Sequence, residues 1–183
     1  RLSLNLFQRM CGIATETAKY VKELADTHTE LLDTRKTAPG LRVLDKLAVK
    51  HGGGTNHRMG LYDMAMIKDN HIKMAGGIAK AVEQVRARIA EGIKIEVETT
   101  NIDEVHQAIA AGADIIMLDN MSNDDMKKAV AIVAGRAKLE ASGGITIKRL
   151  ASIGQIGVDF VSSGALTHSV RSMDISLDIE VVK

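Results

Sequence analysis

Aromatic side chains are nearly missing from this sequence. Phe7, Tyr20, Tyr62 and Phe160 are the complete set among 183 residues. Proteins that bind single strands of nucleic acid stack the bases on aromatic rings. The formal net charge is +1, from 24 basic and 23 acidic side chains, so no overall field attracts nucleic acid or a membrane surface. We therefore expect no nucleic-acid or membrane partner and favour a small-molecule ligand.

Cysteine and long apolar runs are also scarce. Cys11 is the single cysteine, which excludes an internal disulfide and fits a reducing compartment. No apolar run reaches the roughly 20 residues that span a bilayer, and no zinc spacing, P-loop or dinucleotide motif is present. These absences predict a cytoplasmic protein. They also predict that Cys11 packs in the core and that His28, His51 and His106 are surface groups.

The periodicity of the chain predicts one α/β domain over residues 1–183. Segments with apolar residues at helical spacing alternate along the chain with short apolar strands, and the loops that connect them are short. Such alternation indicates a parallel sheet, either open and doubly wound or closed into a full or partial barrel. We expect helices at 1–24, 41–50, 78–90, 102–111, 121–134 and 147–153, and strands at 29–34, 62–67, 93–98, 113–118, 137–141 and 158–162.

The positions of polar residues favour the barrel. Lys68, Glu98, Asp119, Ser142 and Ser163 each lie at or just past the C-terminal end of a different expected strand. Barrel enzymes build their sites there, whereas a doubly wound sheet gathers its ligands at one switch point. A full eight-stranded barrel takes about 250 residues. We therefore predict an incomplete or open (β/α) barrel of about six parallel strands with flanking helices.

The C-terminal tail has a strand pattern of its own. In residues 174–181, Ile175, Leu177, Ile179 and Val181 alternate with polar residues. This alternation predicts a half-buried strand. The chain offers no obvious sheet partner for it.

Cationic residues gather in and near residues 51–73. Arg35 and Lys36 follow the first expected strand, His57 and Arg58 follow a triple glycine, and Lys68 ends the next strand. An arginine can bind a carboxylate or phosphate through two parallel hydrogen bonds. Each group has a plainer interpretation, a solvated basic loop or a glycine that ends a helix. Together, at one barrel mouth, they predict an anion site.

Two carboxylates share the same rim. Glu98 and Asp119 end successive strands and can hold Mg²⁺ directly or through water, bind sugar hydroxyls, or stabilise a developing positive charge. The alternative is that they are ion-pair partners for Lys68. Lys68 could also be a Schiff-base lysine, although the polar neighbours Asp69 and Asn70 weigh against that role.

Two glycine turns follow the late strands. Ser142, Gly143 and Gly144 form the first, and Ser163 and Gly164 form the second, with His168 close by. In barrels, turns after the final strands that open onto a helix bind phosphate through free backbone N–H groups. A ligand that carries phosphate is the leading hypothesis.

The chain resembles a known enzyme family in nearly its whole length. The matching segments are DTRKTAPGLR, GGGTNHRMGLYDMAMIKDNHI, IEVETT, MLDNM, LEASGGI and GVDFVSSGALTHS. They resemble the quinolinate phosphoribosyltransferases, also called nicotinate-nucleotide pyrophosphorylases (carboxylating), which are pentosyltransferases. The resemblance implies that quinolinate and phosphoribosyl pyrophosphate react with Mg²⁺ to give nicotinate mononucleotide, pyrophosphate and CO2 in NAD biosynthesis.

The resemblance also implies residue roles. A quinolinate pocket would comprise Arg35, His57, Arg58 and Lys68, with Arg1 reaching the site of a neighbouring subunit. Groups that face phosphoribosyl pyrophosphate and Mg²⁺ would be Lys36, Glu98 and Asp119, and phosphate would lie at Ser142, Gly143, Gly144, Ser163, Gly164 and His168.

The family carries a further domain of roughly a hundred residues before the barrel. The resemblance implies that this N-terminal domain is absent from the chain and that the protein forms a homo-oligomer, a dimer or a hexamer built from dimers. Two alternatives stay open. The chain could be a weak or inactive barrel that binds anions, or a homologue that uses another acceptor.

Overall fold

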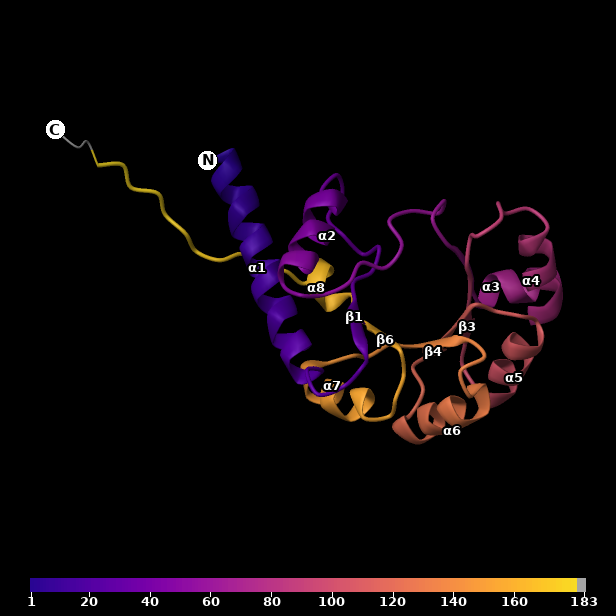
Figure 1. The fold of residues 1–183 in the computed structure, drawn as a ribbon. Coiled ribbons are helices and arrows are strands. Elements are labelled where there is room, and N and C mark those ends of the chain that lie inside the picture. The colour runs from indigo at the N-terminus through magenta and orange to yellow at the C-terminus, as the bar shows by residue number, and fades with distance from the viewer. Residues whose placement is uncertain (181–183) are drawn as a thin grey trace.

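The computed structural model describes residues 1–180, which form one sheet with helices around it (Figure 1). The elements, in chain order, are α1 (Leu2–Glu23), β1 (Glu30–Leu32), α2 (Arg42–His51), β2 (Ala65–Ile67), α3 (Asp69–Ala75), α4 (Ile78–Arg86), β3 (Ile95–Thr99), α5 (Ile102–Ala110), β4 (Ile115–Asp119), α6 (Asn123–Val133), β5 (Lys138–Ser142), α7 (Ile147–Gly154), β6 (Phe160–Ser162) and α8 (Ala165–His168).

The sheet is an open barrel. Its six strands are parallel and lie in the order β1-β6-β5-β4-β3-β2. Within residues 1–180, β1 and β2 form the two edges of the sheet and do not pair with each other. An isolated bridge joins Leu32 on β1 to Thr55, which lies in the loop before β2. The predicted open barrel of six parallel strands is confirmed.

The core lies between the sheet and the helices that cover it. Strand β4 is apolar on both faces, as is typical of a covered parallel sheet, and Ile116 and Leu118 on it are fully buried, as is Val97 on β3. Asn101 is the N-cap of helix α5, and its side chain accepts a hydrogen bond from the Glu104 amide. Such caps satisfy the free N–H groups of the first turn. The strand ends are therefore held on a rigid frame.

The region before α3 differs from the prediction in two ways. The strand expected from residue 62 begins at Ala65, because Asp63 accepts hydrogen bonds from the amides of Met59 and Gly60 and turns the chain there. The short helix α3 was not predicted. Its few residues show no helical spacing of apolar side chains, and none of them is buried.

The predicted strand at 174–181 is wrong in its described part. Residues 174–180 form no strand and run away from the body of the molecule past α1 (Figure 1). The tail is tied to a helix: the Met173 amide donates to the Gln8 carbonyl, and the Gln8 side chain donates to the Ile175 carbonyl. A helix offers no ladder of free backbone groups, so a strand cannot form against it. Val181 lies outside the described residues.

The burial predictions were right for three histidines and wrong for the cysteine. His28, His51 and His106 are exposed, as predicted, whereas Cys11 is only half-buried rather than part of the core. Among the helices of residues 1–180, none combines the length and the apolar composition that crossing a bilayer requires.

Candidate active site

One cavity of about 730 Å³ lies at the C-terminal ends of the strands. Every predicted site residue except Arg1 lines it: Arg35, Lys36, His57, Arg58, Lys68, Glu98, Asp119, Ser142, Gly143, Gly144, Ser163, Gly164 and His168. These residues come from all six strand ends and from the loop after α2. The clustering expected from the barrel is therefore present.

Arg1 does not line the cavity. It is exposed before the first turn of α1, where its carbonyl accepts a hydrogen bond from the Asn5 amide. Its predicted role concerns a neighbouring subunit and stays a prediction.

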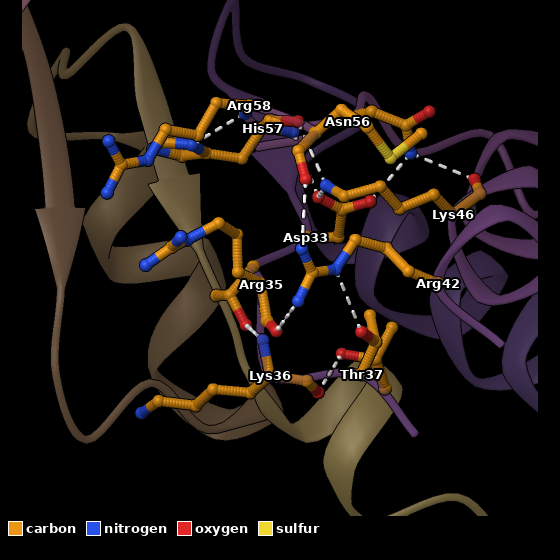
Figure 2. A network of polar contacts seen from close by, with 12 residues as sticks. Asp33, Arg35, Lys36, Thr37, Arg42, Lys46, Asn56, His57 and Arg58 are labelled. Atoms are coloured by element: carbon orange, nitrogen blue, oxygen red, sulfur yellow. Dashed lines mark hydrogen bonds and ion pairs between the residues drawn. The ribbon is translucent and has the colours of Figure 1, made fainter. Parts of the chain in front are cut away.

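The loop after β1 is fixed by an arginine from α2. The Arg42 guanidinium donates to the Arg35 carbonyl at 3.2 Å, to the Met59 carbonyl at 3.1 Å and to Thr37 Oγ1 at 3.1 Å (Figure 2). Arg42 thus joins the two cationic loops by their backbones. Because these bonds use no side-chain cation of either loop, Arg35 and Lys36 remain free to face the cavity.

A buried ionic group holds the same two loops from below. Asp33 is fully buried and accepts hydrogen bonds from Lys46 Nζ, from Asn56 Nδ2 at 2.6 Å and from the His57 amide at 2.9 Å (Figure 2). Burial raises the pKa of Asp33, and Lys46 and Asn56 oppose that rise. Lys46 also donates to the His57 carbonyl at 2.9 Å. A buried pair of this kind specifies one loop geometry.

Two buried carboxylates meet the His57 ring. His57 Nε2 lies 3.2 Å from Glu96 Oε2 and 3.3 Å from Glu140 Oε2. Burial lowers the pKa of His57, and its contacts with Glu140 and Glu96 raise it. Burial and the charge of Glu140 raise the pKa of Glu96 to about 7. At neutral pH, Glu96 is therefore protonated in a substantial share of the molecules.

Glu96 and Glu140 were not predicted as part of the site. A signal was present in the sequence, because each glutamate interrupts an apolar strand two residues before a predicted site residue, Glu98 or Ser142. Side chains two apart on a strand point to the same face. A charge at that position indicates an inward-facing group beneath the mouth.

Arg58 and Arg35 converge on the cavity. Figure 2 shows the ends of Arg35, Lys36 and Arg58 extending to one side, away from Asp33 and Lys46. Burial and the charge of Arg35 lower the pKa of Arg58. Arg58 Nη1 donates to the Met64 carbonyl at 3.0 Å and Nη2 to Met66 Sδ at 3.5 Å, and each of these nitrogens carries a second N–H. Like charges this close are stabilised when an anion binds between them.

Lys68 and Glu98 form an ion pair of 2.8 Å. Glu98 is therefore an ion-pair partner of Lys68, as the alternative interpretation of the sequence held. Both groups also line the cavity. The Lys68 side chain is 46% exposed. A Schiff-base lysine needs a desolvated amine, so this setting does not suit that chemistry. Asp119 has no ion-pair partner within residues 1–180 and accepts a hydrogen bond from Asn120 Nδ2 at 2.8 Å.

The first glycine turn requires glycine for two reasons. Gly143 has φ +83, and a Cβ there would lie 2.3 Å from Asn120 Oδ1. The turn therefore brings bare backbone into the cavity. At the second turn, a Cβ on Gly164 would lie 2.8 Å from the His168 ring, so glycine lets His168 pack against the loop.

Comparison with known proteins identifies the family. The model of the family described as "Quinolinate phosphoribosyl transferase, C-terminal domain" matches residues 13–178. The chain belongs to the quinolinate phosphoribosyltransferase family. The chain is 49% identical over 179 residues to a probable nicotinate-nucleotide pyrophosphorylase [carboxylating] of Bacillus subtilis, an alignment that covers 98% of this chain and 62% of that protein.

Plant and bacterial members of the family are similar to the chain along its length. It is 50% identical over 200 residues to quinolinate phosphoribosyltransferase [decarboxylating] 2, mitochondrial, of Nicotiana glauca, covering 98% of this chain and 56% of that one. A crystal structure of NadC from Streptococcus pyogenes has a TM-score of 0.91 at 45% identity, covering 95% of this chain and 61% of that chain. The chain thus spans about three fifths of the length of these relatives.

Proposed function

We propose that this chain transfers the phosphoribosyl group of phosphoribosyl pyrophosphate to quinolinate and removes one carboxylate as CO2. The products are nicotinate mononucleotide, pyrophosphate and CO2. The observation that carries the proposal is one cavity that gathers cations, carboxylates and glycine turns from different strand ends. Membership of the quinolinate phosphoribosyltransferase family supports it.

The acceptor would bind at the open side of the barrel. The chain from Thr55 to Met64 leads from the β1 edge to the β2 edge, and it carries Arg58. Arg35 follows β1 and Lys68 follows β2, so three cations flank the gap between the edge strands. Two carboxylates on one pyridine ring match several cations held at fixed positions, and that match fixes the ring orientation.

The phosphate-bearing substrate would bind on the other side. The turn at Ser142, Gly143 and Gly144 follows β5, and Asp119 follows β4, and these two strands lie farthest from the open gap. Bare backbone at Gly143 allows N–H groups to approach phosphate oxygens. Lys36 lies next to Gly164 in the second turn, which follows β6, and adds a positive charge to that turn.

The transfer then follows from the charges that the site presents. The ring nitrogen attacks the ribose carbon while pyrophosphate leaves with the bonding electron pair. Positive charge builds on the ribose, and the carboxylates of Glu98 and Asp119 stabilise it. The pyridine nitrogen is now cationic. The electron pair of the adjacent carbon–carboxylate bond stays on the ring as CO2 departs, and that ring carbon takes up a proton.

The donor set at the rim fits Mg²⁺. Glu98 Oε2 bonds to Lys68 and Asp119 Oδ2 to Asn120, whereas Oε1 and Oδ1 accept no hydrogen bond from the described residues. Free carboxylate oxygens beside a wet cavity are ligands that Mg²⁺ accepts, together with water and substrate phosphates. When bound, the ion supplies positive charge that stabilises the leaving pyrophosphate.

We also infer that the protein acts as a homo-oligomer, a dimer or a hexamer built from dimers, in which Arg1 would face a neighbouring site. The predicted cytoplasmic location is part of the same proposal. Some plant relatives are mitochondrial or chloroplastic proteins by name. A second candidate function is a barrel that binds the anions without turning them over, which the cations that line the cavity would support.

The test is product formation. The chain is incubated with phosphoribosyl pyrophosphate and Mg²⁺, with quinolinate in one reaction and nicotinate in a matched one, and products are identified by mass spectrometry. Nicotinate mononucleotide from quinolinate supports the proposal. Product only from nicotinate indicates another acceptor, binding of quinolinate by calorimetry without product indicates the inactive barrel, and neither binding nor product contradicts the whole proposal.

A further inference from the structure

Both ring nitrogens of His57 are directed at groups of the protein itself. The amide N–H of Arg58 donates to His57 Nδ1 at 2.7 Å. On the other side of the ring, Nε2 faces Glu96 Oε2 at 3.2 Å and Glu140 Oε2 at 3.3 Å. The His57 side chain lines the cavity but is only 7% exposed. The ring edge that could donate to a ligand is therefore turned away from it.

The contact with Arg58 fixes the tautomer of the ring. A backbone N–H can only donate, so Nδ1 must present its lone pair. The ring proton then lies on Nε2, directed at the two glutamates. A second proton on Nδ1 would point at the Arg58 amide hydrogen. Any further proton of the cluster is consequently held on Glu96, whose two carboxylate oxygens are buried and lack a hydrogen-bond partner within residues 1–180.

A metal ion is the competing occupant of this cluster. His57, Glu96 and Glu140 could each offer one ligand atom, and these atoms lie within 4.8 Å of one another. A metal bound at Nε2 needs the lone pair of that nitrogen, which places the ring proton on Nδ1. The Arg58 amide occupies that side of the ring as a donor. The hydrogen-bond pattern therefore favours the protonated Nε2 over a metal ligand.

His57 is also fixed through its backbone. Its amide donates to Asp33, at the end of β1, and its carbonyl accepts from Lys46 on α2. Its ring contacts Glu96 on β3 and Glu140 on β5. Four elements thus locate one residue, and the next residue along the chain is Arg58. Arg35 also lies close to Arg58 and lines the same cavity.

We propose that His57 is a positioning residue: its ring holds the Arg58 amide and the carboxylates of Glu96 and Glu140, and it makes no hydrogen bond to the acceptor's carboxylates. The inference rests on the proposed function for what Arg58 binds, but not for the state of the ring. Arg58, Arg35 and Lys68 remain the groups that contact the dicarboxylate.

The first test needs no ligand. Nitrogen NMR of the ¹⁵N-labelled chain at neutral pH reports which ring nitrogens carry protons, and His57→Gln identifies the signals by their loss. We expect a protonated Nε2 and an unprotonated Nδ1. Protons on both nitrogens, or a protonated Nδ1 together with a stoichiometric metal by elemental analysis, would overturn the proposal.

The second test is a double-mutant cycle on quinolinate binding, measured by calorimetry. His57→Gln retains a donor for the glutamates but removes the acceptor for the Arg58 amide. We expect it to weaken binding about fivefold, the effect of one lost hydrogen bond. In the Arg58→Gln background the same change should have no further effect, because His57 acts through Arg58.

Additive losses in the cycle would mean that His57 contacts the ligand itself, and the proposal would be wrong. Circular dichroism of each variant checks that the fold is retained. If the unmodified chain binds no quinolinate, the proposed function fails, while the NMR result still decides the state of His57.

Discussion

At the residue scale, Lys68 places a positive charge at the cavity. It follows β2 and pairs with Glu98 on the neighbouring strand β3. Lys68→Ala removes the cation and leaves the Glu98 charge without its partner. We expect turnover to fall by about a hundredfold or more, as when one preorganised electrostatic group is lost, with the thermal unfolding midpoint nearly unchanged. Steady-state kinetics and thermal unfolding measure the two quantities.

Lys73→Ala is the matched control for that variant. Lys73 is exposed on α3 and pairs with Asp69 at 3.5 Å, outside the cavity. Its loss should leave turnover unchanged. Equal activity of the two variants would show that Lys68 takes no part in the reaction.

The buried cluster around His57 predicts a pH dependence of stability. The folded state raises the pKa of Glu96 from its usual 4.5 to about 7. Between about pH 5 and pH 7 the folded chain therefore holds more protons on this group than the unfolded chain. The stabilisation is present in full below the unfolded pKa and is lost as the pH rises through the folded one.

We expect the free energy of unfolding, measured with urea at a series of pH values, to fall across this window. In Glu96→Gln the carboxyl no longer titrates, and the fall between pH 5 and pH 7 should flatten. Glu91→Gln, an exposed glutamate, is the control and should retain the slope. An unchanged slope in Glu96→Gln would mean that Glu96 does not hold the proton.

The residues that sequence alone could predict are those that end strands. Lys68, Asp119 and Ser142 were predictable because each follows an apolar strand and all strand ends of a parallel barrel meet at one mouth. Asp33 and Glu140 were not, because their roles depend on which strands become neighbours and on what lies below the mouth. Strand order and side-chain contacts arise only in the folded chain.

At the element scale, the loop contacts of Arg42 give the next prediction. One guanidinium joins the loop after β1 to the loop before β2. Lysine retains the charge but cannot reach three acceptors from one plane. In Arg42→Lys we expect faster amide hydrogen exchange in residues 33–37 and 57–60, and a KM for quinolinate raised about tenfold with a smaller change in kcat. Arg88→Lys is the control, because Arg88 is exposed just after the end of α4 and donates to the Gln84 carbonyl.

If exchange in both loops stayed as in the unmodified chain, Arg42 would not hold them. A fall in kcat with the KM unchanged would point instead to a direct part in the reaction.

The turn after β5 provides a second prediction at this scale. Gly143→Ala places a Cβ against Asn120 at a positive φ, and the turn must shift. Gly135→Ala, at φ +76 with no atom within 4 Å of the added Cβ, carries the same backbone strain without the clash. We expect the KM for phosphoribosyl pyrophosphate to rise about tenfold in Gly143→Ala only. Similar KM values in both variants would exclude a phosphate role for this turn.

The periodic elements were the predictable part of the fold. Helices such as α5 and α6 carry apolar residues at helical spacing over several turns, and the buried strands between them are continuous apolar runs. The tail at 174–180 carries a strand pattern just as regular, but no free sheet edge lies beside it. Alternation alone does not provide a partner, which is why that prediction failed.

At the scale of the whole molecule, the open barrel gives the reaction two distinct sides. Cations flank the gap between β1 and β2, and glycine turns and carboxylates follow the strands farther round the sheet. A dicarboxylate and a phosphorylated sugar would therefore meet in one cavity from different directions. We propose that transfer of the phosphoribosyl group and loss of the carboxylate both occur there, in that order.

The most direct measurement is release of labelled CO2 from carboxyl-labelled quinolinate by the unmodified chain. We predict release only when phosphoribosyl pyrophosphate and Mg²⁺ are both present, because the ring nitrogen must carry the ribose before the carboxylate can leave. In Lys68→Ala we predict release close to background. Equal release without phosphoribosyl pyrophosphate, or at the same rate in Lys68→Ala, would contradict the proposal.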